Sequence, residues 1–294
     1  MQTAQAGWLE VTATGANPEA LEDALLEAGA LAVTLTDAAD VPILEPELGT
    51  HPTWPSTCVT GLFAADADEA AVLAAVQATI PETEMGPWTA SRLEDREWVR
   101  AWMDHYHPMQ FGDRLWICPT GHEAEMPSDA VTIHLDPGLA FGTGTHPTTS
   151  LCLQWLDGMD CQGRDVLDMG CGSGVLAVAA ARLGAAHVDG VDIDPQAVRA
   201  TQENAQRNGV NLRACLPDAQ PDGDYDIVLA NILAAPLMVM APALIGRLRA
   251  GGHIVLAGLL ETQADEVIAA YAPLIRLRIG AVQDGWARLQ GQLD

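Results

Sequence analysis

Three glycines at alternate positions follow an apolar stretch in the middle of the chain. Residues 165–174 read Asp-Val-Leu-Asp-Met-Gly-Cys-Gly-Ser-Gly, so an expected strand runs directly into Gly170, Gly172 and Gly174. Glycine permits dihedral angles that other residues avoid, and it lets the backbone come close to a ligand. The free N–H groups at the start of the next helix point toward that ligand. This order of residues predicts a loop that binds a nucleotide-like cofactor.

A carboxylate follows at a suitable distance. Asp192 ends the next expected strand, where the ribose of such a cofactor offers two hydroxyl groups. Dinucleotide-binding proteins use Gly-x-Gly-x-x-Gly, which would require a glycine where this chain has Val175. The sequence therefore argues against a nicotinamide-dependent dehydrogenase. The spacing Asp-x-Gly-x-Gly-x-Gly instead resembles the first motif of the Rossmann-like methyltransferases, which implies S-adenosylmethionine as the cofactor.

An asparagine ends a third expected strand. Asn231 lies in Asp-Ile-Val-Leu-Ala-Asn-Ile-Leu-Ala and resembles the Asn-Pro-Pro-Tyr-like element of methyltransferases that act on nitrogen. Methyl transfer from a sulfonium is an in-line displacement, so a carbonyl oxygen that accepts the amine N–H bonds can align the amine lone pair. Capping the next helix is the alternative role for Asn231. A general base is not identified, and His134, His146 and Asp136 are candidates only by their position in the sequence.

The elements that must position these residues alternate between strand and helix from Pro147 onward. Such alternation predicts a parallel sheet with helices on both faces, which binds ligands at the carboxyl ends of its strands. Expected strands cover residues 165–168, 187–192, 212–215, 225–230, 253–256, 274–281 and 285–289. Expected helices cover residues 147–156, 175–183, 195–208, 237–248 and 262–271. Residues 111–118 and 130–135 are expected to enter this domain as strands.

The first ninety or so residues follow a different order. Periodicity predicts two helices among four strands, in the order of the split βαβ unit of a ferredoxin-like domain. The strands are expected over residues 7–14, 31–36, 58–63 and 88–93, and the helices over residues 18–28 and 67–80. Residues 94–106 are expected to form a connecting helix with Trp98, Trp102 and Tyr106 along one face, packed on a core or exposed to a partner.

Composition limits the partners. The chain has 294 residues and a formal net charge of −26, from 40 acids and 14 bases, and every base is an arginine. Such a surface repels phosphate backbones, so we expect a basic partner and no direct nucleic acid contact, although a salt-adapted genome would give the same composition. The six scattered cysteines predict neither a metal site nor disulfides. Without a long apolar run or a leader, a monomeric cytoplasmic protein with no membrane contact is expected.

A glycine- and threonine-rich segment makes the motifs specific to one family. Residues 141–149 read Phe-Gly-Thr-Gly-Thr-His-Pro-Thr-Thr, residues 191–195 read Val-Asp-Ile-Asp-Pro, and residues 231–234 read Asn-Ile-Leu-Ala. With the glycine loop, these motifs resemble the PrmA family, the bacterial methyltransferases of the large-subunit ribosomal protein numbered eleven. The resemblance covers nearly the whole chain.

The resemblance implies an α/β fold with two domains. Residues 1–93 would form a ferredoxin-like α+β substrate-recognition domain, and residues 94–107 a helical linker. Residues 108–294 would form a Rossmann-like methyltransferase domain with a mostly parallel seven-stranded sheet.

The resemblance also implies the site and the reaction. Thr149, Gly170, Asp192 and Asn231 match the family positions that contact S-adenosylmethionine, and Asn231 is the candidate catalytic residue. The substrates would be lysine ε-amines and the N-terminal α-amine of a basic ribosomal protein. A methyltransferase acting on RNA or on a small-molecule amine is the alternative. A catalytically inactive binding module would leave the glycine loop, Asp192 and Asn231 without a role.

Overall fold

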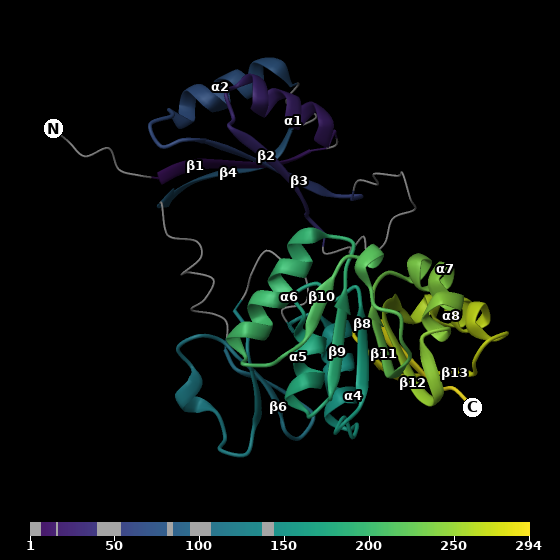
Figure 1. Cartoon of the computed structure of the whole chain (residues 1–294). Coiled ribbons are helices and arrows are strands. Elements are labelled where there is room, and N and C mark those ends of the chain that lie inside the picture. Colours follow the sequence, from purple (N-terminus) through teal and green to yellow (C-terminus); the bar gives the residue numbers. More distant parts are fainter. Residues whose placement is uncertain (1–6, 16, 40–53, 81–84, 95–106, 137–143) are drawn as a thin grey trace. The chain divides into compact units, whose positions relative to one another are not determined.

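The computed structural model describes residues 7–15, 17–39, 54–80, 85–94, 107–136 and 144–294. The chain divides into two compact units, Met1–Arg100 and Ala101–Asp294 (Figure 1). The expected connecting helix, with its three aromatic side chains, lies outside the described residues, and so do residues 141–143 of the threonine-rich segment. Glu94, the first residue of that expected helix, is described, and it is instead the last residue of a strand.

The first unit is a four-stranded antiparallel sheet with two helices on one face (Figure 1). Its strands lie in the order β2-β3-β1-β4. In chain order its elements are β1 (Gly7–Gly15), α1 (Pro18–Glu27), β2 (Ala32–Asp37), β3 (Thr57–Ala64), α2 (Glu69–Thr79) and β4 (Met85–Glu94). Alternate residues of β1 and β3, such as Leu9 and Val59, pack against Leu21 and Leu25 of α1 in one core. Asn17 caps α1 by accepting the Ala20 N–H.

The second unit contains a seven-stranded sheet in the order β10-β9-β8-β11-β12-β14-β13. The neighbours from β10 to β12 are parallel, whereas β14 is antiparallel to both β12 and β13. Its strands are β8 (Asp165–Met169), β9 (His187–Val191), β10 (Arg213–Cys215), β11 (Tyr225–Asn231), β12 (Leu248–Leu260), β13 (Leu277–Gln283) and β14 (Trp286–Gln292). The predicted mixed α/β fold with a large parallel sheet is confirmed.

Helices cover both faces of this sheet (Figure 1). The helices α4 (Pro147–Asp157) and α5 (Val175–Arg182) share one buried apolar cluster with the sheet, and α7 (Ala234–Ile245) and α8 (Ala264–Tyr271) share the other. The helix α6 (Pro195–Arg207) follows β9. Strands of the sheet centre, such as β11, bury side chains on both faces, because both faces are covered.

The expected single strand over residues 111–118 is wrong. Two strands, β5 (Met109–Phe111) and β6 (Leu115–Cys118), form an antiparallel hairpin there, and β7 (Val131–His134) completes a separate three-stranded sheet. The chain turns at Gly112, which has a φ of +69°. The Asp157 carboxylate of α4 stabilises this turn by accepting the backbone N–H groups of Asp113 and Arg114. A partner 44 residues away in the chain thus decides the turn.

The boundary between α7 and β12 also differs from the expectation. The helix ends at Ile245 rather than at Leu248, and Leu248 instead begins a strand that continues to Leu260. The helix contains no polar side chain, and its end is marked by Gly246, the C-cap residue that directly follows Ile245, so the expected helix runs past a local stop signal. The strand tolerates two successive glycines because its pairing with β11 is irregular at that point, where Gly251 has a φ of +76°.

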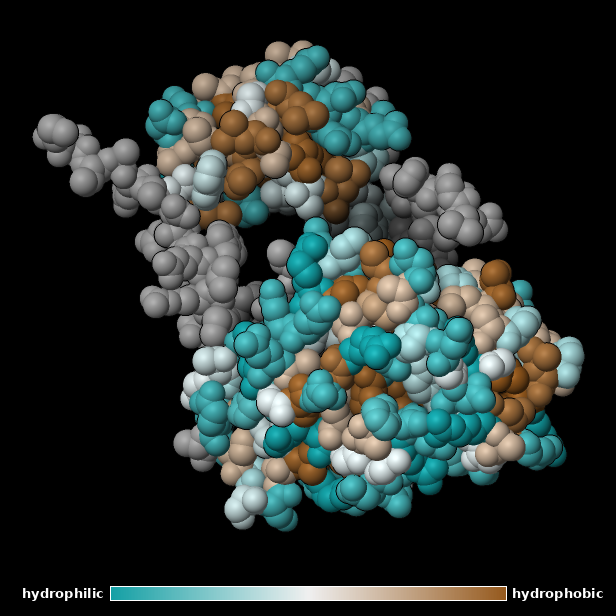
Figure 2. Space-filling view, in the orientation of Figure 1, coloured by the Kyte–Doolittle hydropathy of each residue, from teal (hydrophilic) through white to brown (hydrophobic). Residues whose placement is uncertain are grey.

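Apolar side chains reach the surface at a few positions of the second unit. Ile193, Leu233 and Val239 are more than half exposed. Figure 2 shows brown residues among hydrophilic ones over the region of α7 and α8. No helix in the described ranges is both long and apolar enough to span a bilayer.

Candidate active site

Three neighbouring strands bring the sequence-predicted residues to one edge of the sheet. Met169 of β8 pairs with Val191 of β9 on one side and with Ala230 of β11 on the other. Gly170, Asp192 and Asn231 are the next residues of these three parallel strands, so they lie side by side at the carboxyl ends. Adjacent parallel strands lie about 4.8 Å apart, which makes one ligand able to contact all three strand ends.

The glycine loop has the backbone conformation that its sequence predicts. Gly170, Gly172 and Gly174 have φ values of +76°, +55° and +78°. The N–H groups of Gly170 and Cys171 donate to the Val191 carbonyl at 2.7 and 3.1 Å, which holds the loop against β9. A Cβ atom on Gly174 would lie 2.7 to 2.9 Å from three side-chain atoms of Thr201. Glycine is therefore required there by conformation and by space.

Asp192 is oriented by the loop that it faces. Its Oδ2 accepts the Gly172 N–H at 2.9 Å, and its Oδ1 accepts the Asp194 N–H at 2.9 Å. An ionised carboxylate has about four acceptor positions, so both oxygens keep acceptor capacity for another partner. The next residue, Ile193, is 85% exposed. A fixed carboxylate thus stands beside an apolar surface, which suits a sugar attached to a flat ring.

The helix α6 supports the glycine loop through two side-chain hydrogen bonds, a role that the sequence did not reveal. Thr201 is fully buried, and its hydroxyl donates to the Gly172 carbonyl at 3.1 Å. The Asn204 side-chain amide donates to the Ser173 carbonyl at 2.8 Å. Polar residues three apart on the inner face of an amphipathic helix are the signal that would have indicated these contacts. Burial raises the pKa of the Cys171 thiol to about 12, so this side chain stays protonated.

Asn231 contacts α4 through only one end of its amide. Its Nδ2 donates to the Thr149 hydroxyl at 3.3 Å, and Thr149 is 2% exposed in the first turn of α4. Within the described ranges no group donates to Asn231 Oδ1. The alternative role as a helix cap is wrong, because Leu233 occupies the N-cap position of α7. The Thr149 contact thus holds the amide while its oxygen remains an available acceptor.

Known proteins are similar to this chain over nearly its whole length. Residues 7–294 match the family described as Ribosomal protein L11 methyltransferase (PrmA). The chain belongs to the PrmA family. The ribosomal protein L11 methyltransferase of Aeromonas hydrophila is 50% identical over 290 residues, which cover 97% of this chain and 98% of the relative. That of Methylococcus capsulatus is 51% identical over 276 residues, covering 93% of this chain and 94% of the relative.

A solved structure of a similar protein agrees with the fold over part of the chain. The crystal structure of ribosomal protein L11 methylase from Lactobacillus delbrueckii subsp. bulgaricus is 33% identical, with a TM-score of 0.57. The match covers 64% of this chain and 100% of that chain. The family identified from the sequence motifs is therefore confirmed.

Two of the three candidate bases, Asp136 and His146, use their side chains in other hydrogen bonds in this PrmA chain. Burial alone would raise the pKa of Asp136, but hydrogen bonds from Thr120 and the Arg207 guanidinium outweigh it and lower the pKa. His146 caps α4 by accepting the Thr148 N–H through Nδ1, and burial lowers its pKa. The backbone of His134 is bound by the side chain of Asn208. None of these three residues is assigned as the general base.

A fourth titratable group lies under the loop of this PrmA chain. Asp168 is 1% exposed; its Oδ2 accepts the Ala177 N–H at 3.1 Å, whereas its Oδ1 has no partner. Burial raises the pKa of Asp168 to about 7, and the charge of Asp192 adds to this rise. An orphaned buried oxygen next to the glycine loop is suited to a polar ligand that brings a donor. Among the described residues no group of three or more His, Cys, Asp or Glu is arranged to hold a metal ion.

Proposed function

We propose that this PrmA chain transfers methyl groups from S-adenosylmethionine to lysine ε-amines and to the N-terminal α-amine of the large-subunit ribosomal protein L11. The observation that carries the proposal is 50% identity, over 97% of the chain, to relatives named ribosomal protein L11 methyltransferase. The geometry at the carboxyl ends of β8, β9 and β11 supports the same reaction.

The site residues fit the cofactor. Gly170 begins the loop whose backbone would hold the methionine part, and Asp192 would accept hydrogen bonds from both ribose hydroxyls. The exposed Ile193 side chain offers an apolar surface to the adenine ring. Thr149 would act through Asn231, whose amide it holds. When bound, the cofactor supplies an electrophilic methyl group on a sulfonium.

Asn231 would orient the attacking amine. Its free Oδ1 can accept an N–H bond of a neutral amine, which leaves the nitrogen lone pair directed toward the methyl group. The amine must first lose a proton, and the reference pKa is about 10.4 for lysine and about 8 for an α-amino group. A desolvated site lowers these values, because burial disfavours the charged form. The neutral amide does not compete as a nucleophile.

The two units would have different roles, one in substrate recognition and the other in methyl transfer. We infer that residues 1–93 are a ferredoxin-like domain that recognises the substrate, joined by residues 94–107 to the methyltransferase domain of residues 108–294. A recognition domain that moves can present several amines to one methyl donor. The net charge of −26 suits a basic protein substrate. We place the protein in the cytoplasm as a monomer.

The test is a methylation assay with three acceptors. The purified chain is incubated with methyl-labelled S-adenosylmethionine and ribosomal protein L11, ribosomal RNA or a small amine, and products are read by mass spectrometry. We expect label on lysine side chains and on the N-terminus of the protein. Label on RNA or on the small amine, with none on the protein, would assign the alternative function instead.

A further inference from the structure

A cavity lies on the same sheet but away from the glycine loop. It has a volume of about 500 Å³, which is within the range of small-molecule sites. His253 in its wall pairs with Ile227 of β11, four positions before the pair that Ala257 makes with Asn231. Four residues of a strand span about 13 Å. The cavity is therefore separate from the proposed cofactor site and lies toward the amino ends of the parallel strands.

Positive charge gathers at this cavity without acidic partners. Arg276 and Arg278 line it, and neither forms an ion pair with any described residue. Five arginines elsewhere do pair with aspartates, namely Arg114, Arg207, Arg213, Arg247 and Arg249. Asp294 also lines the cavity but pairs with neither arginine. In a chain of net charge −26, two guanidinium groups that line one cavity and have no ion pair with any described residue favour an anion there.

A buried arginine strengthens this positive region. Arg288 is 8% exposed, and its guanidinium donates to the Leu151 carbonyl and to Gln290 Oε1, while its Nε has no partner. Burial lowers the pKa of Arg288, and the charge of Arg278 lowers it further. Since Gln290 Oε1 is engaged by Arg288, the Gln290 NH₂ group remains a donor for the cavity. Gln290 pairs directly with Arg278 across β14 and β13.

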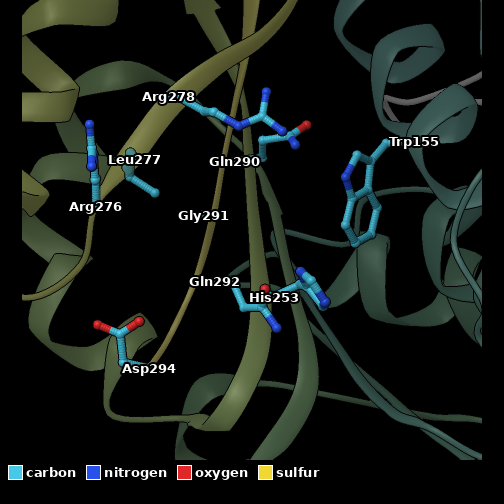
Figure 3. Close-up of a pocket in the computed structure, with 9 residues that line it drawn as sticks. All are labelled: Trp155, His253, Arg276, Leu277, Arg278, Gln290, Gly291, Gln292 and Asp294. Atoms are coloured by element: carbon cyan, nitrogen blue, oxygen red, sulfur yellow. The ribbon is translucent and has the colours of Figure 1, made fainter.

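The remaining walls are flat or accept hydrogen bonds. The rings of Trp155 and His253 meet edge to face, with centroids 6.1 Å apart. Gln292 donates its amide to the Gly251 carbonyl, which leaves its oxygen as an acceptor. Figure 3 shows Trp155 and His253 on one side of the cavity, Arg278 and Gln290 together at one end, and Asp294 away from both. Donors, flat rings and acceptors thus occupy different parts of one cavity.

We propose that this cavity binds a nucleotide. Arg276, Arg278 and the Gln290 amide would bind the phosphate, whose charge and three terminal oxygens suit several donors. The base would lie against Trp155, and Gln292 and Asp294 would accept hydrogen bonds from sugar hydroxyls or base amino groups. A free nucleotide and an unpaired nucleotide of an RNA share this chemistry.

Calorimetric titration with adenosine monophosphate tests the site, with S-adenosylhomocysteine in saturating excess to occupy the glycine loop. We expect one nucleotide per chain, and binding at least about tenfold weaker for adenosine and for inorganic phosphate. Arg278→Gln should weaken binding by about tenfold or more, because it removes a charge-assisted hydrogen bond. Trp155→Leu should also weaken it. The matched control is Arg182→Gln, another exposed arginine without an ion pair among the described residues, which should change binding less than about twofold.

Unchanged affinity for S-adenosylhomocysteine would show that the Arg278→Gln variant is folded. No uptake of adenosine monophosphate by the natural chain, or equal binding by the natural chain and Arg278→Gln, would overturn the proposal. Equal binding of phosphate alone would exclude the base from the site and overturn it as well. A single-stranded RNA that binds more tightly than the mononucleotide, and loses that affinity in Arg278→Gln, would identify RNA as the source.

Discussion

Asn231 shows how one side chain can be held and remain reactive. Its nitrogen is bound to Thr149, a residue buried in a different element, and its oxygen has no donor among the described residues. The spacing of motifs predicts that both residues belong to the site. It does not predict that one acts through the other, because that contact joins positions 82 residues apart.

The different roles of Asn231 and Thr149 predict losses of activity of different size. Asn231→Ala should lower kcat by about a hundredfold or more, since an orienting group is worth that much in a preorganised site. Thr149→Val keeps the shape but loses the hydroxyl, so a smaller loss is expected, and the matched Thr149→Ser variant should retain activity. Single-turnover methylation of ribosomal protein L11 measures the effect. Full activity in Asn231→Ala would remove Asn231 from the proposed mechanism.

Asp168 predicts how stability depends on pH. Burial raises its pKa to about 7 in the folded chain, whereas an unfolded aspartate has a pKa of about 3.9. Between those values the folded state binds more protons, so stability is lost as pH rises through this window, by up to about 1.4 kcal/mol per pH unit.

The Asp168→Asn variant cannot ionise at this position. We expect its free energy of unfolding, measured with urea from pH 4 to pH 8, to exceed that of the natural chain increasingly as pH rises. An identical pH dependence for both proteins would show that Asp168 does not carry a raised pKa.

At the scale of elements, the glycine loop offers a matched pair of substitutions. Gly174 and Gly163 have similar positive φ values, +78° and +74°. A Cβ on Gly174 would meet Thr201, whereas one on Gly163 would meet nothing within 4 Å. Both alanine variants should lose roughly 1 kcal/mol of stability from the strained backbone. Only Gly174→Ala should also weaken S-adenosylhomocysteine binding, by tenfold or more in calorimetry. Equal affinities would mean that the loop does not contact the cofactor.

The elements of the sheet could be predicted where local signals are strong. The strands β8 and β9 are short runs with buried apolar residues that are followed directly by glycine or aspartate. The helix α6 begins after the Asp194 cap and ends at Arg207, before the C-cap Asn208 and Gly209. These features act within a few residues, so they can be recognised in the sequence alone. The order of the motifs then places the candidate site at the strand ends.

Distant partners decided what the sequence could not show. The Gly112 turn depends on Asp157, and the support of the loop depends on Thr201 and Asn204. The end of α7 is a different case, because Gly246, the C-cap that directly follows the helix, is a local stop signal that the expected bounds run past. For the turn and for the support of the loop, the deciding contact joins segments that only the folded chain brings together, and tertiary contacts override local preference.

At the scale of the whole molecule, composition gives the amount of charge but not its distribution. Fourteen arginines among forty acids indicate a strongly acidic protein. Their number does not reveal that some of these arginines are paired one by one with aspartates, while Arg276, Arg278 and Arg288 gather at one edge of a sheet. A single chain can thus attract a basic protein at long range and still bind an anion locally.

The long-range attraction predicts a dependence on salt. The net charge of −26 should steer a basic substrate toward the enzyme, and raising the salt from about 0.1 M to 1 M shortens the screening length from about 10 Å to about 3 Å. We therefore expect kcat/KM for ribosomal protein L11 to fall at least about tenfold across this range. Binding of S-adenosylhomocysteine, which has no net charge, should change far less over the same range and serves as the control. A kcat/KM that stays constant while the control also stays constant would show that recognition depends on short-range contacts, and that the acidic surface does not guide the substrate.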